Sequence, residues 1–162
     1  MDALDHIQQL WARQMPELDT SSMALIGRLQ ILHKQLTQTM SQTFRQFQLT
    51  DAGFDVLATL LRSGPPHALT PKQLLEQLLV TSGSMTSRID SLEKQGLIAR
   101  TIGINDKRQR QVQLTPKGKT TIEQAIKAHV ETQKRLLSVL TEQEQRDLTE
   151  MLRTFMARSA QT

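Results

Sequence analysis

The segment that decides the fold spans residues 82–100 and has the sequence SGSMTSRIDSLEKQGLIAR. Ile89 and Leu92 are three residues apart, as on one face of a helix, and Gly96 stands where a helix commonly ends in the left-handed conformation. Beyond Gly96, residues 97–102 alternate in polarity, as in a half-buried strand. The segment therefore predicts a helix followed directly by a β-strand.

A second helix is predicted just before this one. Thr70 is a capping residue, Pro71 suits the first helical position, and Gln73 completes a capping box. Two helices joined by a short glycine-containing break form a helix-turn-helix, whose second helix enters the DNA major groove. The candidate DNA contacts are Lys72 and the exposed positions at the start of the second helix: Ser82, Ser84, Met85, Thr86, Ser87 and Arg88. The serines and threonines could also serve only as helix caps.

A basic hairpin is predicted after the helix-turn-helix. Residues 97–102 and 111–115 both have strand patterning, and a polar stretch, 103–110, separates them. This stretch carries Lys107, Arg108 and Arg110. A narrow minor groove attracts an inserted arginine, so the hairpin is a second candidate contact with DNA. A turn that only needed to be soluble would require a single such charge.

Long apolar helices flank this central region. An apolar residue recurs every three or four positions from Leu25 to Phe47, which predicts a helix of about six turns. Further helices are predicted from residue 4 to about residue 15, before Pro16, and over residues 116–140 and 142–156. The last is expected to bury one side, made of Leu148, Met151, Leu152, Phe155 and Met156. The fold class is thus mostly α with a small β-hairpin. The apolar stripe of the long helix is too extended for a small monomer and indicates a partner chain.

The positive charge of the chain is concentrated in the centre. The 162 residues carry a net charge of +4, but residues 70–120 alone hold nine basic and four acidic side chains, a local charge of +5. The remainder has a net charge of −1. A local basic surface suits a polyanion such as double-stranded DNA, although a solvated basic face has the same composition.

Several classes of function are disfavoured by composition. Cysteine is absent, which excludes thiolate nucleophiles, cysteine zinc sites and thiol-based redox sensing. The four histidines have no metal-ligand spacing, and no glycine-rich phosphate loop or nucleophile elbow occurs, so neither an enzyme nor a metal or cofactor site is expected. No apolar stretch long enough to span a membrane and no signal peptide is visible, so we expect the chain in the cytoplasm.

The segment 82–100 resembles the recognition helix and first wing strand of the MarR family of transcription regulators. Asp106, Lys107 and Arg108, followed by Val112, Leu114, Thr115 and Gly118, resemble the wing signature of that family. The resemblance implies a winged helix-turn-helix homodimer that binds a pseudo-palindromic operator, usually as a repressor released by a small ligand. It also implies that residues 1–48 and 116–162 form a helical dimerisation domain and residues 49–115 the DNA-binding domain.

The N-terminal helix resembles one branch of the family more closely, the urate-responsive, PecS-like regulators. This resemblance implies a ligand site at Trp11, Asp55, Arg88 and Arg100. A tryptophan and a wing-base arginine would hold a small aromatic anion such as urate or a phenolic acid. The anion would repel Asp55, change its pairing with Arg88 and shift the recognition helix. Trp11 could instead be a packing residue, and Asp55 an ordinary first-turn acid.

Two alternatives to a ligand-responsive regulator remain. One is a constitutive repressor without a small-molecule ligand. The other is a protein-interaction module that has a winged-helix shape but does not bind DNA. The basic hairpin argues against the second, because an interaction wing needs no concentrated positive charge.

Overall fold

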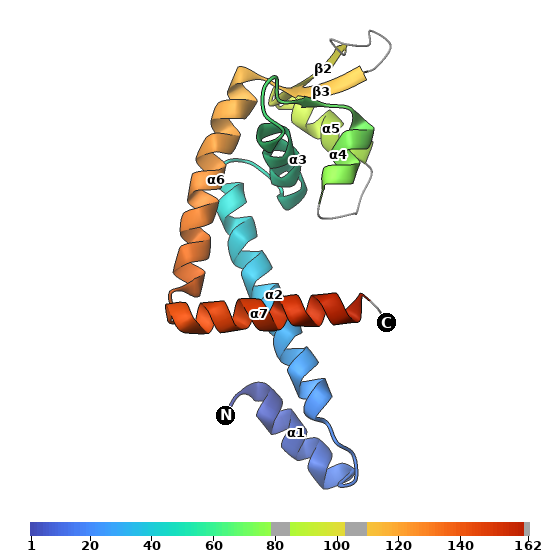
Figure 1. Cartoon of the computed structure of the whole chain (residues 1–162), viewed down its shortest axis with the longest axis vertical. Helices are drawn as coiled ribbons and strands as arrows, with labels where there is room; N and C mark the ends of the chain where they lie inside the picture. Colours follow the sequence, from blue (N-terminus) through green and yellow to red (C-terminus); the bar gives the residue numbers. More distant parts are fainter. Residues whose placement is uncertain (79–84, 103–109, 161–162) are drawn as a thin grey trace. The chain divides into compact units, whose positions relative to one another are not determined.

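A computed structural model describes residues 1–78, 85–102 and 110–160 (Figure 1). Four of the predicted DNA contacts, Ser82, Ser84, Lys107 and Arg108, lie outside the described residues. The described chain forms two compact units, residues 1–39 and residues 40–162. The long helix α2, Ser21–Arg45, contributes to both.

The N-terminal unit pairs helix α1, Ala3–Gln14, with the first part of α2. The carboxylate of Asp2 caps α1 by accepting from the backbone N–H groups of Leu4 and Asp5. Arg28 of α2 then holds both Asp2, at 2.8 Å from Nε to Oδ2, and Asp5. Gly27 allows close packing, because a Cβ there would lie 2.9 Å from Leu4 Cδ2.

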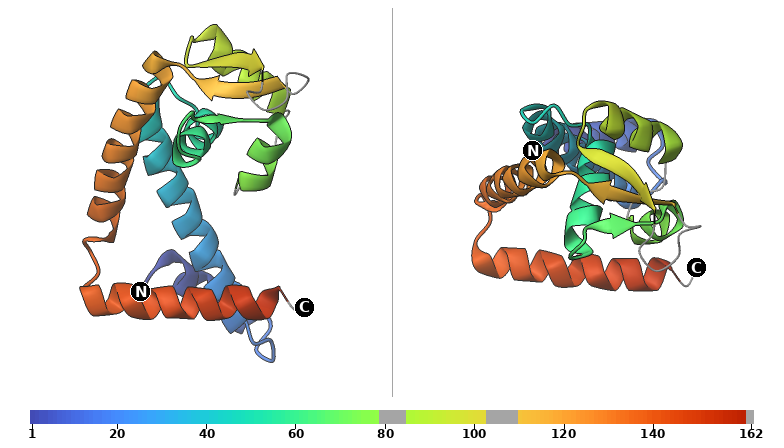
Figure 2. Two further views of the ribbon diagram at one scale, coloured as in Figure 1. Left: turned by 45° about the horizontal axis from the view of Figure 1, so that its top comes forward. Right: turned by 90° about the horizontal axis from the view of Figure 1, so that it is seen from above.

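The second unit begins with the end of α2 and continues through the remaining elements (Figures 1 and 2). Its helices are α3 (Asp51–Arg62), α4 (Pro71–Gln77), α5 (Met85–Lys94), α6 (Pro116–Leu137) and α7 (Glu142–Ser159). Its strands are β1 (Ala68–Leu69), β2 (Ile98–Ile102) and β3 (Arg110–Leu114). The mostly helical fold with a small sheet confirms the predicted fold class.

Threonine side chains cap four of these helices, and the cap at Thr70 is the one predicted above. Thr50, Thr70, Thr115 and Thr141 each accept a hydrogen bond from the backbone N–H three residues on, which satisfies a donor that the helix itself leaves unpaired. Thr70 and Thr141 form full capping boxes with Gln73 and Glu144. Local sequence therefore sets where these helices begin.

The sheet has one more strand than the predicted hairpin. β2 and β3 are antiparallel, with Ile98 opposite Leu114 and Ile102 opposite Arg110. The short strand β1 pairs with the other edge of β3, so the order is β1-β3-β2. β1 is only two residues long and comes shortly after two prolines. Two residues are too few to form an alternating pattern, so the sequence does not predict this strand.

The core of the second unit is built around α3. Val56, Leu57 and Leu60 are fully buried against side chains from the other elements, chiefly Leu74, Ile89, Leu92, Ile98, Val112 and Ile122. α7 takes no part in this core, since none of its residues is buried. The prediction that the last helix buries its apolar side is therefore wrong for the single chain: Met151, Leu152, Phe155 and Met156 are all exposed. The helical period identifies an apolar face but says nothing of what covers it.

Candidate nucleic-acid interface

The helix pair α4–α5 presents one buried and one exposed side. Leu74 of α4 is fully buried, and the side chains of Ile89 and Leu92 of α5 are at most 3% exposed. These anchors fix which face of α5 reaches the surface, because residues three apart lie on the same side of a helix. Thr86 and Ser87, in the first turn of α5, are exposed. The exposed start of α5 is thus lined by short hydroxyl side chains.

The predicted DNA contacts within the described residues have different surroundings. Lys72 is exposed, and its Nζ lies 4.0 Å from Glu76 Oε1, one helical turn along α4. Met85 is half-buried and packs against the core, so it also has a structural role. Arg88 is half-buried, whereas Arg110 is exposed at the start of β3. Lys72 and Arg110 are the basic side chains of this group that are open to solvent.

Arg100 of β2 is held by two acids of α5. Its guanidinium forms ion pairs with Asp90 through Nη2 and with Glu93 through Nη1. The backbone N–H of Arg100 also donates to Glu93 Oε1 at 3.3 Å. The hydrogen bond that Arg100 donates to Asp90 and the negative charges of both acids raise the pKa of Arg100, so the guanidinium stays charged. We call this group, Asp90, Glu93 and Arg100, the α5–β2 clamp.

A crevice of about 340 Å³ lies between α4, α5 and the two wing strands. Arg110 contributes positive charge to it, whereas the charge of Arg100, which also lines it, is offset by Asp90 and Glu93. The rest of its lining is mainly apolar. The other lining residues are Pro71, Leu75, Met85, Thr86, Ile89, Gln111 and Val112.

Asp55 lies on α3 and does not line this crevice. Burial raises the pKa of its carboxyl, while the positive charge of Arg88 acts in the opposite direction. The structure therefore places Asp55 and Arg88 within electrostatic reach, although no ion pair joins Asp55 to any described residue. Arg88 lines a small cavity with Thr50 and Gly53 that does not include Arg100.

The fourth predicted ligand residue belongs to the N-terminal unit. Trp11 lies on α1 and is 37% exposed. It is not part of the core of either unit. Its indole is therefore available as a flat contact surface, as the ligand hypothesis requires.

His129 of α6 is a polar residue that the sequence interpretation did not single out. Its ring lies 5.1 Å from that of Phe44 and 5.0 Å from that of Phe54. Burial lowers the pKa of His129, and the charge of Asp55 opposes this shift. Its Nδ1 is buried and has no hydrogen-bond partner among the described residues. The only sequence signal was its place on the apolar face of α6, between Ile126 and Val130.

Other kinds of site are not found in the described part of the chain. Residues 1–78, 85–102 and 110–160 contain no group of three histidine or acidic side chains able to hold a metal ion. Over the same ranges, no helix combines the length and apolarity that a membrane crossing needs.

A helix-turn-helix beside an antiparallel wing, with hydroxyl and basic side chains exposed, defines a winged-helix DNA-binding protein. The chain belongs to the MarR family of transcription regulators, whose family model matches residues 47–109. It is 33% identical to the HTH-type transcriptional regulator PecS of Dickeya dadantii over 152 residues, which cover 94% of this chain and 91% of PecS. The protein is accordingly a transcription regulator and not an enzyme.

Two solved structures have the same fold. One is a cysteine-to-serine mutant of MarR from E. coli complexed with operator DNA, with a TM-score of 0.68 and 25% identity over 90% of this chain and 97% of that one. The other is the organohalide-sensing transcriptional regulator RdhR in its 2,4-dichlorophenol-bound form. Its TM-score is 0.71, with 20% identity over 88% of this chain and 83% of that one.

Proposed function

We propose that this regulator is a homodimer that represses transcription by binding a pseudo-palindromic operator in the cytoplasm. The observation that carries the proposal is the orientation of α5, which buries Ile89 and Leu92 and exposes Thr86 and Ser87 beside the wing. A helix exposed in this way can enter the major groove, while Arg110 and the predicted tip residues Lys107 and Arg108 reach the minor groove. The structural neighbour with operator DNA supports this use of the fold.

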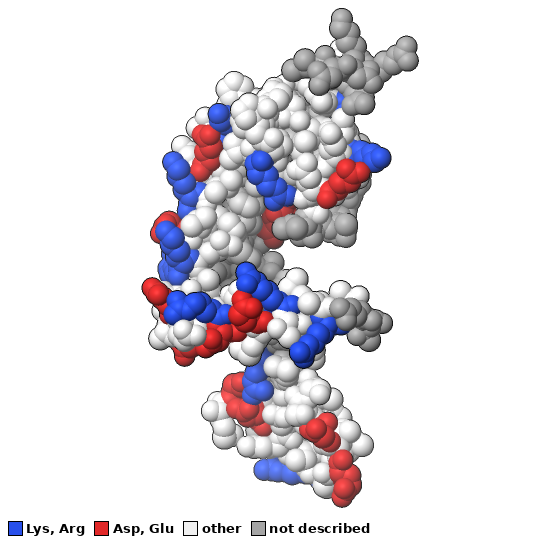
Figure 3. Space-filling view, viewed as in Figure 1, with Lys and Arg blue, Asp and Glu red and all other residues white. Residues whose placement is uncertain are grey.

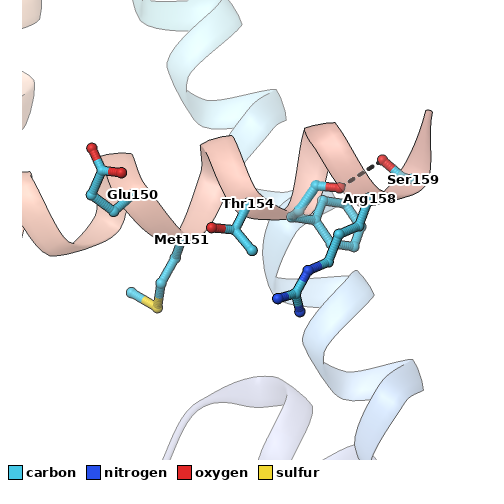
Figure 4. A pocket seen from close by; sticks show the side chains of 6 residues that line it. Glu150, Met151, Thr154, Arg158 and Ser159 are labelled. Carbon is cyan, nitrogen blue, oxygen red and sulfur yellow. Dashed lines mark hydrogen bonds between the residues drawn. The ribbon is translucent and has the colours of Figure 1, made fainter. Parts of the chain in front are cut away.

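The dimer is proposed from the uncovered apolar residues of α7. Six residues of this helix, among them Met151, Phe155 and Arg158, line an open hollow of about 590 Å³ to which no other element contributes. Met151 and Arg158 project from the same side of the helix (Figure 4). Acidic and basic side chains are intermixed elsewhere on α7 (Figure 3), and some pair along the helix, as Arg153 does with Glu150 at 2.6 Å. A second chain packing on this apolar side would bury it, with residues 1–48 and 116–162 as the dimerisation domain.

The ligand is proposed to be a small aromatic anion such as urate or a phenolic acid. The family includes a sensor crystallised with a chlorinated phenol, and PecS is similar to this chain over nearly its whole length. Trp11, Asp55, Arg88 and Arg100 are the proposed ligand residues. Burial already raises the pKa of the Asp55 carboxyl. A bound anion nearby would raise it further, because like charges disfavour the ionised form. The electrostatic attraction between Asp55 and Arg88 would then weaken, and helix α5, which carries Arg88, would move.

A gel-shift assay with the intergenic DNA next to the gene tests the first part of the proposal. We expect a discrete shift at low salt, followed by loss of the complex when urate or salicylate is added. Absence of any shift at low salt would favour the protein-interaction module. A shift that no anion of the panel reverses would favour a constitutive repressor.

A further inference from the structure

The α5–β2 clamp places two negative charges on the helix that is proposed to read DNA. Asp90 and Glu93 lie three residues apart, so both carboxylates leave α5 on the same side. DNA carries one negative charge for about every 1.7 Å of its axis, so unpaired carboxylates on this helix would oppose its approach. Their charges therefore need compensation close by.

The guanidinium of Arg100 supplies this compensation from a different element. Each of its two terminal nitrogens contacts one carboxylate, Nη2 that of Asp90 and Nη1 that of Glu93. Glu93 also accepts from the backbone N–H of Arg100, which ties the main chain of β2 to α5. Arginine suits this role because its planar fork offers several donors in fixed directions.

We propose that Arg100 is a positioning residue of the DNA-binding surface, which offsets one of the two negative charges of Asp90 and Glu93 and fixes the wing strand β2 to helix α5. The wing and the helix then meet DNA as one rigid surface. This inference rests on the proposed function of α5. It assigns to Arg100 an internal role that it performs without touching DNA.

The exposure of the clamp indicates that its effect falls on DNA affinity more than on folding. The side chains of Arg100, Asp90 and Glu93 are 38%, 46% and 36% exposed. Ion pairs this accessible are screened by solvent and add little to stability. The repulsion between uncompensated carboxylates and phosphate, in contrast, arises only when DNA approaches.

The test compares Arg100→Gln with the triple variant Asp90→Asn, Glu93→Gln, Arg100→Gln on the operator that wild type shifts. We expect Arg100→Gln to weaken operator affinity at least tenfold. The triple variant should return to within threefold of wild type, because the acids no longer need compensation. Lys94→Gln is the matched control, since it removes one positive charge from α5 without breaking an ion pair among the described residues, and it should cost less than threefold.

The salt dependence of affinity separates positioning from direct contact. A residue that contacts phosphate contributes about one unit to the slope of log affinity against log salt. We expect the triple variant to keep the wild-type slope. A triple variant that stays as weak as Arg100→Gln, with its slope reduced by about one unit, would overturn the proposal. So would wild-type affinity in Arg100→Gln.

Two further measurements keep the result interpretable. Arg100→Lys retains the charge but lacks the planar fork that contacts both carboxylates, so its operator affinity should lie between those of Arg100→Gln and wild type. A folded Arg100→Lys variant as weak as Arg100→Gln would contradict the charge compensation. Thermal melts establish that each variant is folded. Failure of wild type itself to shift DNA would reject the proposed function, a result distinct from failure of the triple variant to recover.

Discussion

Gly118 lies directly against the carbonyl group of Leu97: a Cβ atom on Gly118 would be 1.8 Å from the Leu97 oxygen and 2.7 Å from its carbonyl carbon. The contact joins the first turn of α6 to the residue just before β2. Because the obstructing atoms are backbone, a side chain at this position could be accommodated only by moving one element away from the other. The glycine thus determines how closely the wing packs on the helix that follows it.

Gly118→Ala is expected to destabilise the protein by about 2–3 kcal/mol, because the added methyl group forces α6 and residue 97 apart. Chemical denaturation monitored by circular dichroism measures this change. Gln124→Ala, at an exposed position of the same helix, is the control and should change stability by less than about 0.5 kcal/mol. Equal stability of the two variants would mean that the contact is readily relieved.

Phe155→Asp is expected to convert the proposed dimer to a monomer without unfolding the second unit, because α7 contributes no residue to the core. Light scattering after size-exclusion chromatography gives the mass directly. Gln143→Glu adds the same charge to the same helix away from the apolar residues and should leave the mass unchanged. A dimeric Phe155→Asp variant would show that α7 is not the interface.

Asp55→Asn is expected to blunt ligand release at least tenfold while leaving operator affinity within threefold. The amide has no charge for the anion to repel, but it keeps the shape of the side chain. Trp11→Phe should have the same phenotype for a different reason, since it reduces the aromatic contact surface. Titration of the protein–DNA complex with urate and with salicylate measures both, and unchanged release in both variants would contradict the proposed ligand site.

Replacement of His129 should remove part of the pH dependence of stability. Burial lowers the pKa of this imidazole in the folded state, so the folded protein binds fewer protons at this site than the unfolded chain. The stabilising contribution is therefore complete above the ordinary pKa of 6.5 and is lost as the pH falls below it. We expect urea midpoints at pH 7.5 and 5.5 to differ less in His129→Phe than in wild type. An unchanged difference would show that other groups govern this range.

Arg28→Gln should loosen α1 from α2, because Asp2 and Asp5 both lose their shared partner. Trp11, the only tryptophan, lies on α1 and reports its motion by fluorescence anisotropy. We expect lower anisotropy in the variant and in wild type at high salt, since exposed ion pairs are screened. Arg13→Gln, which removes a charge from the last turn of α1, should behave like wild type.

The sequence alone predicts most of the fold, because most of its elements are determined by residues close to one another in the chain. The threonine caps and the helix-turn-helix depend on residues within one or two turns of each other, as at Thr70 and Gln73. Strand β1 could not be predicted in this way, because its two residues are defined only by pairing with β3. The exposure of α7 was missed because an amphipathic pattern does not specify its partner.

The candidate site likewise has features that follow from local sequence and features that depend on tertiary contacts. The segment around α5 and its basic neighbours follow from the sequence, since their types and order are enough to suggest a DNA contact. The pairing of Arg100 with Asp90 and Glu93 does not, because charges seven and ten residues away meet only through the turn at Gly96. His129 and Asp55 come from different helices, so their electrostatic coupling is a property of tertiary structure alone.

The uncovered apolar residues of α7 also bear on how much protein is needed for activity. A single 18-residue helix in water is only marginally stable, so α7 depends on whatever packs against it. If that is a second chain, mass action links folding to concentration, and the melting temperature rises as the protein becomes more abundant. The amount of regulator made would then set both how many operators are occupied and how long each molecule persists.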